Sequence, residues 1–450
     1  MGLVDKPSIK KFKNTLRRNF QVCKKEKFVE CLAERFSKED LNVEPNTLLD
    51  KIILGIQDTI NLVFPLKKVS NKQAKKMMNP WMTKEILKLQ KSRDLLKMKW
   101  IKCGHIANSP EHENYKKCRN KVTNMCRLAQ KQFLEKKCEE AKGDSAKLWK
   151  VAKSAMNMKP KQNITPDFVK TKTADGKFRK FDQDTDIANE MNKQFAGMGA
   201  KLAENLQPTE SMFTDFLQFP NPNSERFLLH MVTESRVDEL IQELDTSKST
   251  SLDEIPPLIV KWGAPVLIPI LTKFYNKCVL GGIYPDRLKL ARVIPIFKGG
   301  NKNDTSSYRP ISILSQLNRI FERILRDELY NFIKPKLYSK QFGFRPKNST
   351  EHPVLDLKEK ILENCNKKLI SCILFLDLKK AFDSVSHKIL LQKLEYYGVK
   401  GVALKLFKSY LSNRKQLTCV SGSFSVLDLI EWGVPQGSVL GPLCIVPDLH

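Results

Sequence analysis

Apolar residues recur at three-, four- and seven-residue steps in two stretches of the first third of the chain, residues 86–100 and 115–133. This spacing puts the apolar side chains on one face and predicts two amphipathic helices, joined by a loop near residues 104–110. A third apolar stretch, residues 48–66, contains charged side chains. We expect an amphipathic helix there, because those charges are incompatible with a transmembrane span.

From about Thr233 the pattern changes to shorter apolar segments, typical of a compact α+β domain. Residues 161–232 are interrupted by proline and glycine and predict a connector with one helix from Asp184 to Leu206. These changes divide the chain into a basic helical region (1–160), the connector and a mixed domain (233–450). In the mixed domain we expect helices at 235–244, 315–333, 386–398 and 401–411, a strand at 292–297, and a hairpin of 417–420 with 426–430.

An almost continuous apolar run from Leu369 to Leu376 predicts a buried strand that ends on Asp377. A second acid, Asp383, follows directly after Phe382. A carboxylate at the end of a buried strand is costly to desolvate unless a cation meets it. It could instead cap the helix that follows, and these residues alone leave both roles open.

The charge balance points to a polyanionic partner. The formal net charge is +29, and residues 67–142 alone carry 21 Lys or Arg against 7 Asp or Glu. Such a one-sided excess attracts phosphates regardless of base sequence, so we expect the basic region to contact a nucleic acid backbone. An acidic membrane surface is the second candidate.

The 11 cysteines are scattered without paired spacing. We therefore expect free thiols in a reducing, intracellular compartment, and the polar, basic first residues do not resemble a signal peptide. Cys103, His105, His112 and Cys118 could form a zinc site, but no Cys-x-x-Cys unit anchors them. Zinc is the less favoured interpretation of this cluster.

Two basic residues flank a turn in the mixed domain. Lys298 ends an expected strand, and Arg309 follows across a turn rich in Gly, Asn and Asp. Their side chains can converge on one phosphate, with arginine supplying a fork of donors and lysine a point charge. The alternative is that both are solvated beside the turn.

Two further segments combine glycine with polar residues. In the segment Gln341-Phe-Gly-Phe-Arg, Gly343 permits unusual backbone angles and Arg345 stands between an aromatic residue and a proline. A rigid turn with a surface arginine is the alternative. In the segment Gly433-Val-Pro-Gln-Gly-Ser-Val-Leu-Gly-Pro, the glycines let backbone approach a flat ligand such as a base pair, and Gln436 can hydrogen-bond to it. A glycine-rich turn before a helix is the alternative.

The four segments, in this order and at these separations, resemble the reverse transcriptases of non-LTR retrotransposons of the LINE or Jockey-like kind, over about residues 233–445. The resemblance implies a right-hand polymerase with fingers and a partial palm, preceded by the basic helical region, without a thumb or an endonuclease. It implies RNA-directed DNA synthesis, with an RNA template, a DNA primer and deoxynucleoside triphosphates as substrates. One departure is Ser251, where the family usually has glycine before Leu-Asp.

The resemblance also implies roles for individual residues. Asp377 would bind catalytic magnesium, assisted by the backbone carbonyl of Leu378. Phe382 would lie beneath the sugar and exclude ribonucleotides. Lys298 and Arg309 would hold the incoming triphosphate.

The glycine-containing segments also acquire roles from the resemblance. Gln436 and Gly437 would line the nucleotide pocket, and Gly343 and Arg345 would lie near the template. Asp383 recurs in the family pattern, but its role is open. It could form a structural hydrogen bond at least as well as serve in catalysis.

The other half of a two-metal site is missing from the sequence. The family adds a Tyr-Ala-Asp-Asp hairpin to the first aspartate, and no Tyr-x-Asp-Asp occurs in these 450 residues. One carboxylate cannot hold two magnesium ions in register, so we expect a C-terminally truncated chain without measurable polymerase activity on its own. The palm sheet would then have an unpaired edge and exposed apolar surface.

Other functions stay open. The chain could be a catalytically inactive, nucleic-acid-binding retroelement remnant, or a protein-binding scaffold that uses residues 48–160. We expect no membrane association and no stable protein partner. Basic residues from Lys10 to Lys13 and at Arg17 and Arg18 could serve nuclear import, so we expect an intracellular location, in the nucleus and in cytoplasmic ribonucleoprotein.

Overall fold

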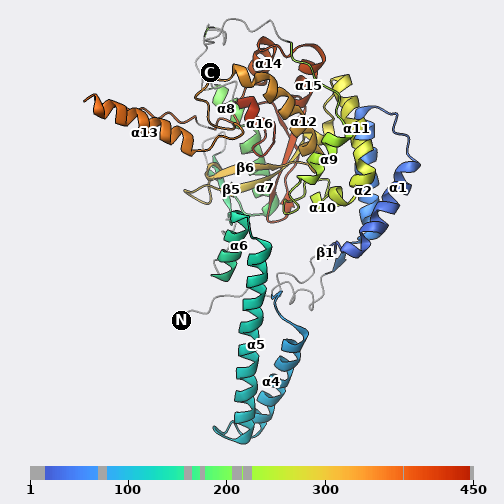
Figure 1. Cartoon of the computed structure of the whole chain (residues 1–450), viewed down its shortest axis with the longest axis vertical. Coiled ribbons are helices and arrows are strands. Elements are labelled where there is room, and N and C mark those ends of the chain that lie inside the picture. The colour runs from blue at the N-terminus through green and yellow to red at the C-terminus, as the bar shows by residue number, and fades with distance from the viewer. Residues whose placement is uncertain are drawn as a thin grey trace. The chain divides into compact units, whose positions relative to one another are not determined.

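A computed structural model describes the chain over residues 16–68, 79–156, 165–172, 178–204, 215, 226–378 and 380–445. The basic run from Lys10 to Lys13 lies outside these residues. The described part of the chain contains both helices and short strands, which confirms a mixed α+β fold (Figure 1). The chain divides into two compact units, Met1–Asn19 with Phe64–Gln162 and Phe20–Val63 with Asn163–His450.

The first unit is built around a helical hairpin of α4 (Lys84–Lys102) and α5 (Pro110–Glu140), which lie side by side in Figure 1. Helix α6 (Ser145–Ala155) follows. The strands β1 (Leu16–Arg17) and β2 (Lys67–Lys68) pair antiparallel in the same unit. Both amphipathic helices predicted from the apolar spacing are confirmed.

The helices of this unit begin at residues whose side chains cap them, but the hairpin buries few of its side chains. Thr83, Ser109 and Asp144 accept hydrogen bonds from backbone amides in the first turns of α4, α5 and α6. Ile86 and Val122 are the buried residues of α4 and α5. The pair therefore exposes most of its surface, including its charged faces. No helix in the described ranges is long and apolar enough to cross a membrane.

The second unit contains a helical layer formed by α1 (Lys25–Ser37), α2 (Pro45–Val63), α9 (Glu234–Gln242), α10 (Pro257–Trp262) and α11 (Ala264–Gly281). The apolar stripe of α2 is buried and contacts α1 and α11. We expected these two helices to belong with the basic region up to residue 160. They belong to the second unit, because their apolar faces pack on helices from beyond residue 233.

A five-stranded sheet forms the centre of the second unit. Its order is β6 (Tyr308–Ile313), β5 (Leu290–Phe297), β7 (Arg414–Val420) and β8 (Ser423–Phe424), and β9 (Asp428–Ile430) also pairs with β7. β5 is antiparallel to β6 and parallel to β7. The predicted strand before residue 298 and the hairpin after residue 417 are confirmed.

The chain crosses between β6 and β7 through α12 (Gln316–Ile333), α13 (Glu351–Asn366), α14 (His387–Tyr396) and α15 (Gly401–Leu411). Three of these helices match the predicted positions closely. A short helix, α16 (Gly441–Ile445), follows the sheet. Single 3-10 turns lie at Val22–Lys24, Asp286–Lys289, Thr305–Ser307 and Lys334–Lys336.

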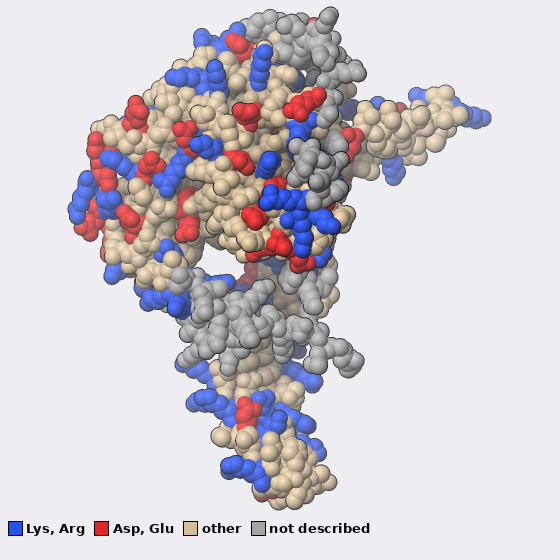
Figure 2. Space-filling view, turned by 180° about the vertical axis from the view of Figure 1, so that it is seen from behind, with Lys and Arg blue, Asp and Glu red and all other residues tan. Residues whose placement is uncertain are grey.

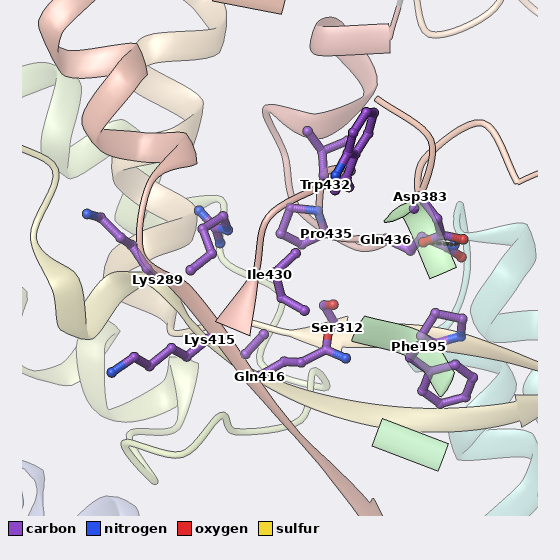
Figure 3. Close-up of a pocket in the computed structure, with 16 residues that line it drawn as sticks. Phe195, Lys289, Ser312, Asp383, Lys415, Gln416, Ile430, Trp432, Pro435 and Gln436 are labelled. Carbon is purple, nitrogen blue, oxygen red and sulfur yellow. Dashed lines mark hydrogen bonds between the residues drawn. The ribbon is translucent and has the colours of Figure 1, made fainter. Parts of the chain in front are cut away.

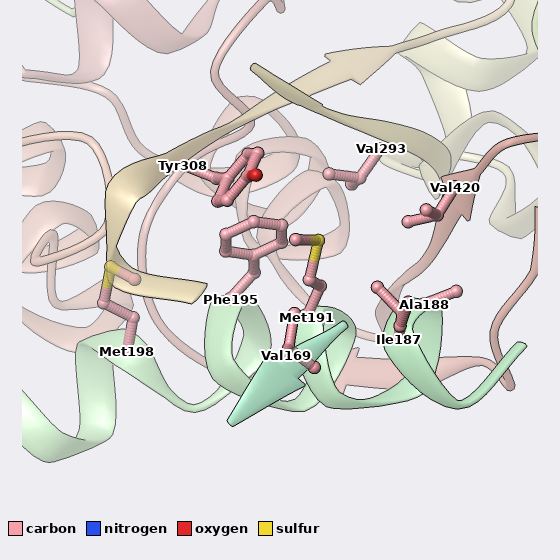
Figure 4. Close-up of a cluster of buried hydrophobic side chains, with 9 residues drawn as sticks. All are labelled: Val169, Ile187, Ala188, Met191, Phe195, Met198, Val293, Tyr308 and Val420. Carbon is pink, nitrogen blue, oxygen red and sulfur yellow. The ribbon is translucent and has the colours of Figure 1, made fainter. Parts of the chain in front are cut away.

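Residues that we expected to form a connector pack instead on the sheet. A strand pair, β3 (Val169–Lys172) with β4 (Phe178–Phe181), precedes the helices α7 (Asp184–Ala196) and α8 (Met198–Glu204). The buried side chains of α7 face the sheet in one apolar cluster (Figure 4), formed by Val169, Ile187, Ala188, Met191, Phe195, Met198, Val293, Tyr308 and Val420. This apolar face made the segment part of the folded core despite its prolines and glycines.

The asparagine on this helix face fixes the contact with the sheet. Asn192 is fully buried, and its Nδ2 donates to the carbonyl of Val426 at 3.0 Å and to a carboxylate oxygen of Asp428 at 2.7 Å. Its Oδ1 accepts from the side chains of Gln416 and Thr418 at 3.2 and 3.0 Å. One side chain thereby satisfies buried polar groups from β7 and β9.

The predicted buried strand at Leu369–Leu376 was wrong. Residues 369–378 form no helix or strand, and their side chains are exposed, with Ile370 at 97%, Phe375 at 80% and Leu376 at 85%. A strand needs a neighbour to bond its backbone, and no described strand pairs with this segment. Helix α13, just before it, has no buried residue and projects from the body of its unit (Figure 1).

Candidate functional site

The loop of residues 432–440 depends on two glycines with left-handed backbone angles. Gly433 has φ +77° and Gly437 has φ +122°. A Cβ on Gly437 would lie 2.5 Å from the carbonyl oxygen of Ser312, so only glycine fits against β6 there. The amide of Ser312 donates to the carbonyl of Gln436 at 2.8 Å and fixes this loop to the end of the strand.

The segment after Asp377 is docked onto the same loop. The amides of Gly433 and Val434 donate to the carbonyls of Val385 and Phe382, each at 2.8 Å. Nε2 of His387 donates to the carbonyl of Gly433 at 2.7 Å. Burial holds the pKa of His387 below its usual value, so the ring stays a neutral donor. Two motifs far apart in sequence therefore share one backbone framework.

Asp383 and Gln436 meet inside this framework. Nε2 of Gln436 lies 3.0 Å from Oδ1 and 2.8 Å from Oδ2 of Asp383 (Figure 3). Burial raises the pKa of Asp383, an effect that the hydrogen bond from Gln436 and the charge of Lys380 partly oppose. The sequence left the role of Asp383 open, and the structure gives it this hydrogen bond.

The pair lines a pocket beside the sheet (Figure 3). Pro310 and Ser312 line it from β6, and Phe195 from α7. Gly199 of α8 closes one side, because a Cβ there would lie 2.3 Å from Cβ of Trp432. Of the predicted site residues, Asp383 and Gln436 line this pocket, and Gly437 packs beside it on Ser312.

A buried acid on α12 supports the far end of the loop. Glu322 is fully buried, and its Oε2 accepts from the amide of Val439 at 2.6 Å. Its Oε1 accepts from the hydroxyl of Tyr410 at 3.1 Å. Burial and this neighbouring acid raise the pKa of Tyr410 well above its usual value, which keeps the hydroxyl a donor. We did not predict Glu322, although it shares a helix stripe with Leu325 and Leu329, a position where a charge is unusual.

Lys298 and Arg309 come together on the β5–β6 hairpin. Arg309 pairs with Ile296 in the register, and Lys298 lies two residues beyond Ile296, so both side chains are on one face. Both are exposed. Pro310 and Ser312 lie at alternate positions, on the face that lines the pocket, so the two cations are brought to each other but do not line the pocket.

The segment predicted to lie near a template contacts the Phe382 region. Phe344 packs edge-on against Phe382 with ring centroids 6.0 Å apart. Arg345 donates from Nη1 to the carbonyls of Tyr338 and Gln341 at 3.1 and 3.3 Å, which ties its own turn together. Gly343 does not have a left-handed angle; Phe344 and Lys347 take these positions, with φ +59° and +65°.

Asp377 and Leu378 lie on the exposed segment that follows α13, away from any partner carboxylate. Both side chains are exposed. No group of three His, Cys, Asp or Glu side chains in the described ranges gathers as a metal site. The described residues therefore do not fit a two-magnesium centre, which needs carboxylates on both sides of the ions.

The tip of the α4–α5 hairpin is an aromatic stack. The ring centroids of His105, His112 and Tyr115 lie 3.8, 4.4 and 5.6 Å from that of Trp100. Cys118 instead donates to the carbonyl of Leu89. These contacts give the histidines a packing role, and the zinc interpretation gains no support from the described residues.

The surface of the hairpin carries a cationic excess. Among the charged side chains on its visible face in Figure 2, Lys and Arg are more frequent than Asp and Glu, whereas the visible face of the second unit shows both signs. Several hairpin acids are already engaged by basic neighbours on their own helix, as in the pairs Arg93–Asp94 and Lys131–Glu135. The lysines and arginines outside such pairs account for the excess positive charge of this surface.

Comparison with known proteins identifies the part of the chain that holds the pocket. Residues 300–446 match the family model described as reverse transcriptase (RNA-dependent DNA polymerase). The chain is 31% identical over 266 residues to the probable RNA-directed DNA polymerase from transposon BS of Drosophila melanogaster, covering 57% of this chain and 28% of that protein.

Two further relatives have similar names. The RNA-directed DNA polymerase from mobile element jockey of Drosophila funebris is 31% identical over 66% of this chain and 31% of its own length. The probable RNA-directed DNA polymerase from transposon X-element of Drosophila melanogaster is 32% identical over 46% of this chain and 23% of its own length.

The chain spans less than a third of the length of each of these relatives. The matched region contains the β6 strand, the Phe382–Asp383 segment and the Gln436 loop, which line the pocket together with Phe195 and Gly199 from outside the match. Residues 300–446 therefore match a reverse transcriptase family, and the chain is similar to RNA-directed DNA polymerases of transposons and mobile elements.

Proposed function

We propose that the chain serves RNA-directed DNA synthesis in a non-LTR retrotransposon, by holding an incoming deoxynucleoside triphosphate against an RNA template and a DNA primer. The observation that carries this proposal is the shared framework of the Phe382–Asp383 segment and the Gln436 loop. Two motifs 53 residues apart meet in one pocket, with a ring at Phe382 beside them. The β5–β6 hairpin then corresponds to fingers, and the sheet with the Gln436 loop to part of a palm.

The reaction joins the primer 3′-hydroxyl to the α-phosphate of the nucleotide and releases pyrophosphate. Reverse transcriptases generally use magnesium for this step, and Asp377 is the candidate ligand of this chain. The described residues do not complete such a centre, so the roles assigned to them are binding and orientation. Lys298 and Arg309 attract the triphosphate, and Phe382 restricts the sugar.

Primer extension and nucleotide binding together test the proposal. We expect the 450-residue chain to bind deoxynucleoside triphosphate, and to bind ribonucleotides more weakly in proportion to the size of the side chain at position 382. We expect no extension of a DNA primer on an RNA template by this chain alone. Extension that Asp377→Ala abolishes would contradict the second expectation, and absence of nucleotide binding would contradict the first.

A catalytically inactive nucleic-acid-binding remnant is the second candidate, favoured by the cationic α4–α5 hairpin. It predicts salt-sensitive RNA binding without nucleotide binding. Lys88→Gln, Lys97→Gln and Arg127→Gln together should then reduce both RNA affinity and its salt dependence. A protein-binding scaffold predicts instead an affinity for a protein that salt does not change. Location in the nucleus and in cytoplasmic ribonucleoprotein is part of the proposal, and imaging of the tagged chain tests it.

A further inference from the structure

The side-chain amide of Gln436 is held in one orientation. Both carboxylate oxygens of Asp383 lie within hydrogen-bond distance of its Nε2. An ionised carboxylate accepts and cannot donate, so it selects the nitrogen end of the amide and rejects the oxygen end. Among the described residues, none donates to Oε1 of Gln436, which is left as a free acceptor at the pocket.

The backbones on both sides of this pair are fixed by other contacts. The amide of Asp383 donates to the carbonyl of Lys380 at 2.8 Å, and the carbonyl of Phe382 accepts from Val434. The carbonyl of Gln436 accepts from Ser312 at 2.8 Å. Because neither backbone depends on the side-chain pair, the carboxylate acts mainly on the rotation of the amide.

We propose that Asp383 is a positioning residue, which orients Gln436 so that its amide oxygen accepts a hydrogen bond from the incoming nucleotide. The donor is a sugar hydroxyl or a base amino group. The hydroxyl is the closer match to the position of Phe382, which precedes Asp383 in the chain and would lie against the sugar. This inference rests on the proposed nucleotide-binding function.

Titration calorimetry with dATP on the full 450-residue chain tests the inference. Asp383→Leu removes the acceptor in a side chain of similar size, and we expect about tenfold weaker binding, the size of one lost hydrogen bond. Asp383→Asn can meet either end of the amide, so about half of the molecules keep the productive rotamer and we expect about a twofold loss. This graded series separates orientation from simple loss of folding.

Two controls show whether Asp383 acts through Gln436. In a Gln436→Ala background, Asp383→Leu should cause no additional loss, because the amide that it orients is gone. Asp428→Asn is the matched control, since Asp428 also accepts from a carboxamide, that of Asn192, without lining the pocket. We expect it to bind dATP like the wild type, and thermal unfolding of every variant reports whether it folds.

Two nucleotides distinguish the sources of the donor. The penalty of Asp383→Leu should vanish with dideoxy-ATP if the sugar hydroxyl is the donor, and with dTTP if a base amino group is. A penalty that persists with both, or that persists in the Gln436→Ala background, overturns the inference, as does wild-type affinity in Asp383→Leu. Failure of the wild type to bind any nucleotide overturns the proposed function and this inference together.

Discussion

Two segments of the second unit were singled out from the sequence, yet they differ in how they are held. The loop at residues 432–440 is bonded on three sides, by Ser312 of β6, by the Phe382–Val385 backbone and by Glu322 of α12. The segment at residues 369–378 is more apolar but lies exposed, without a described strand beside it. An apolar segment therefore becomes buried only when the fold supplies a surface for its side chains and hydrogen-bond partners for its backbone.

Hydrogen exchange compares the backbone protection of the two segments directly, and it has the largest expected effect. The amides of residues 370–378 should exchange near their intrinsic rates, because none of them donates to a described backbone carbonyl. The amides of Gly433, Val434 and Val439 should exchange at least about a thousandfold more slowly. Similar protection in both segments, read by mass spectrometry of overlapping peptides, would break the comparison.

Replacing Glu322 should weaken the loop at residues 432–440 and so make it more like the exposed segment at residues 369–378. Glu322→Ala leaves the amide of Val439 and the hydroxyl of Tyr410 without a buried acceptor, so we expect a loss of about 3 kcal/mol in the free energy of unfolding. Glu322→Gln retains an acceptor and should cost about 1 kcal/mol. Urea unfolding monitored by circular dichroism measures both, and equal costs would show that the loop does not depend on this acceptor.

The contact of α7 with the sheet offers a weaker test of the same principle. Asn192→Ala removes the hydrogen bonds from α7 to residues 416–428, for an expected cost of about 2 kcal/mol. Asn189→Ala, which removes a single hydrogen bond to the amide of Val426, is the matched control and should cost about 1 kcal/mol. A smaller loss for Asn192→Ala than for Asn189→Ala would contradict the packing role of the buried side chain.

The smallest expected effect is a pH dependence at the loop. The pKa of His387 is lowered by burial and by Arg414, and raised by its bond to Gly433 and by Glu431. The unfolded chain therefore takes up this proton first as the pH falls, so stability is lost below pH about 6.5. Between pH 7.5 and 5.5 we expect the wild type to lose at most about 1.4 kcal/mol more than His387→Gln, which can still donate to Gly433. An equal loss of stability in both proteins would show that His387 does not cause the pH dependence.

Features with a local signal were predictable from the sequence. The helix at α12, with Ser315 as its cap, and the β5 strand before Lys298 lie where their periodicity placed them. The position of Lys298 and Arg309 on one face of a hairpin was expected from the turn between them. Gln436 and Asp383 were both singled out, but their contact was not, because nothing local measures the distance between two loops.

The misassignments share a physical cause. The apolar run at 369–376 was expected to be buried, and α7 was expected to lie in a connector, because sequence patterns report apolar content and not the surface it meets. Glu322 and Asn192 were missed for a related reason. A buried polar residue is stabilised by partners that come from distant parts of the chain, and no pattern among residues adjacent in sequence indicates which partners these are.

The packing of α7 on the sheet also bears on how such genes can change. Met191 and Phe195 fill space beside Val293 and Tyr308, which are encoded about a hundred codons downstream. Genetic exchange between diverged copies, with a crossover between these positions, would combine a helix from one lineage with a sheet from another. The side-chain volumes would then disagree even if every catalytic motif were intact. We therefore expect the helix and the sheet to be inherited as one block.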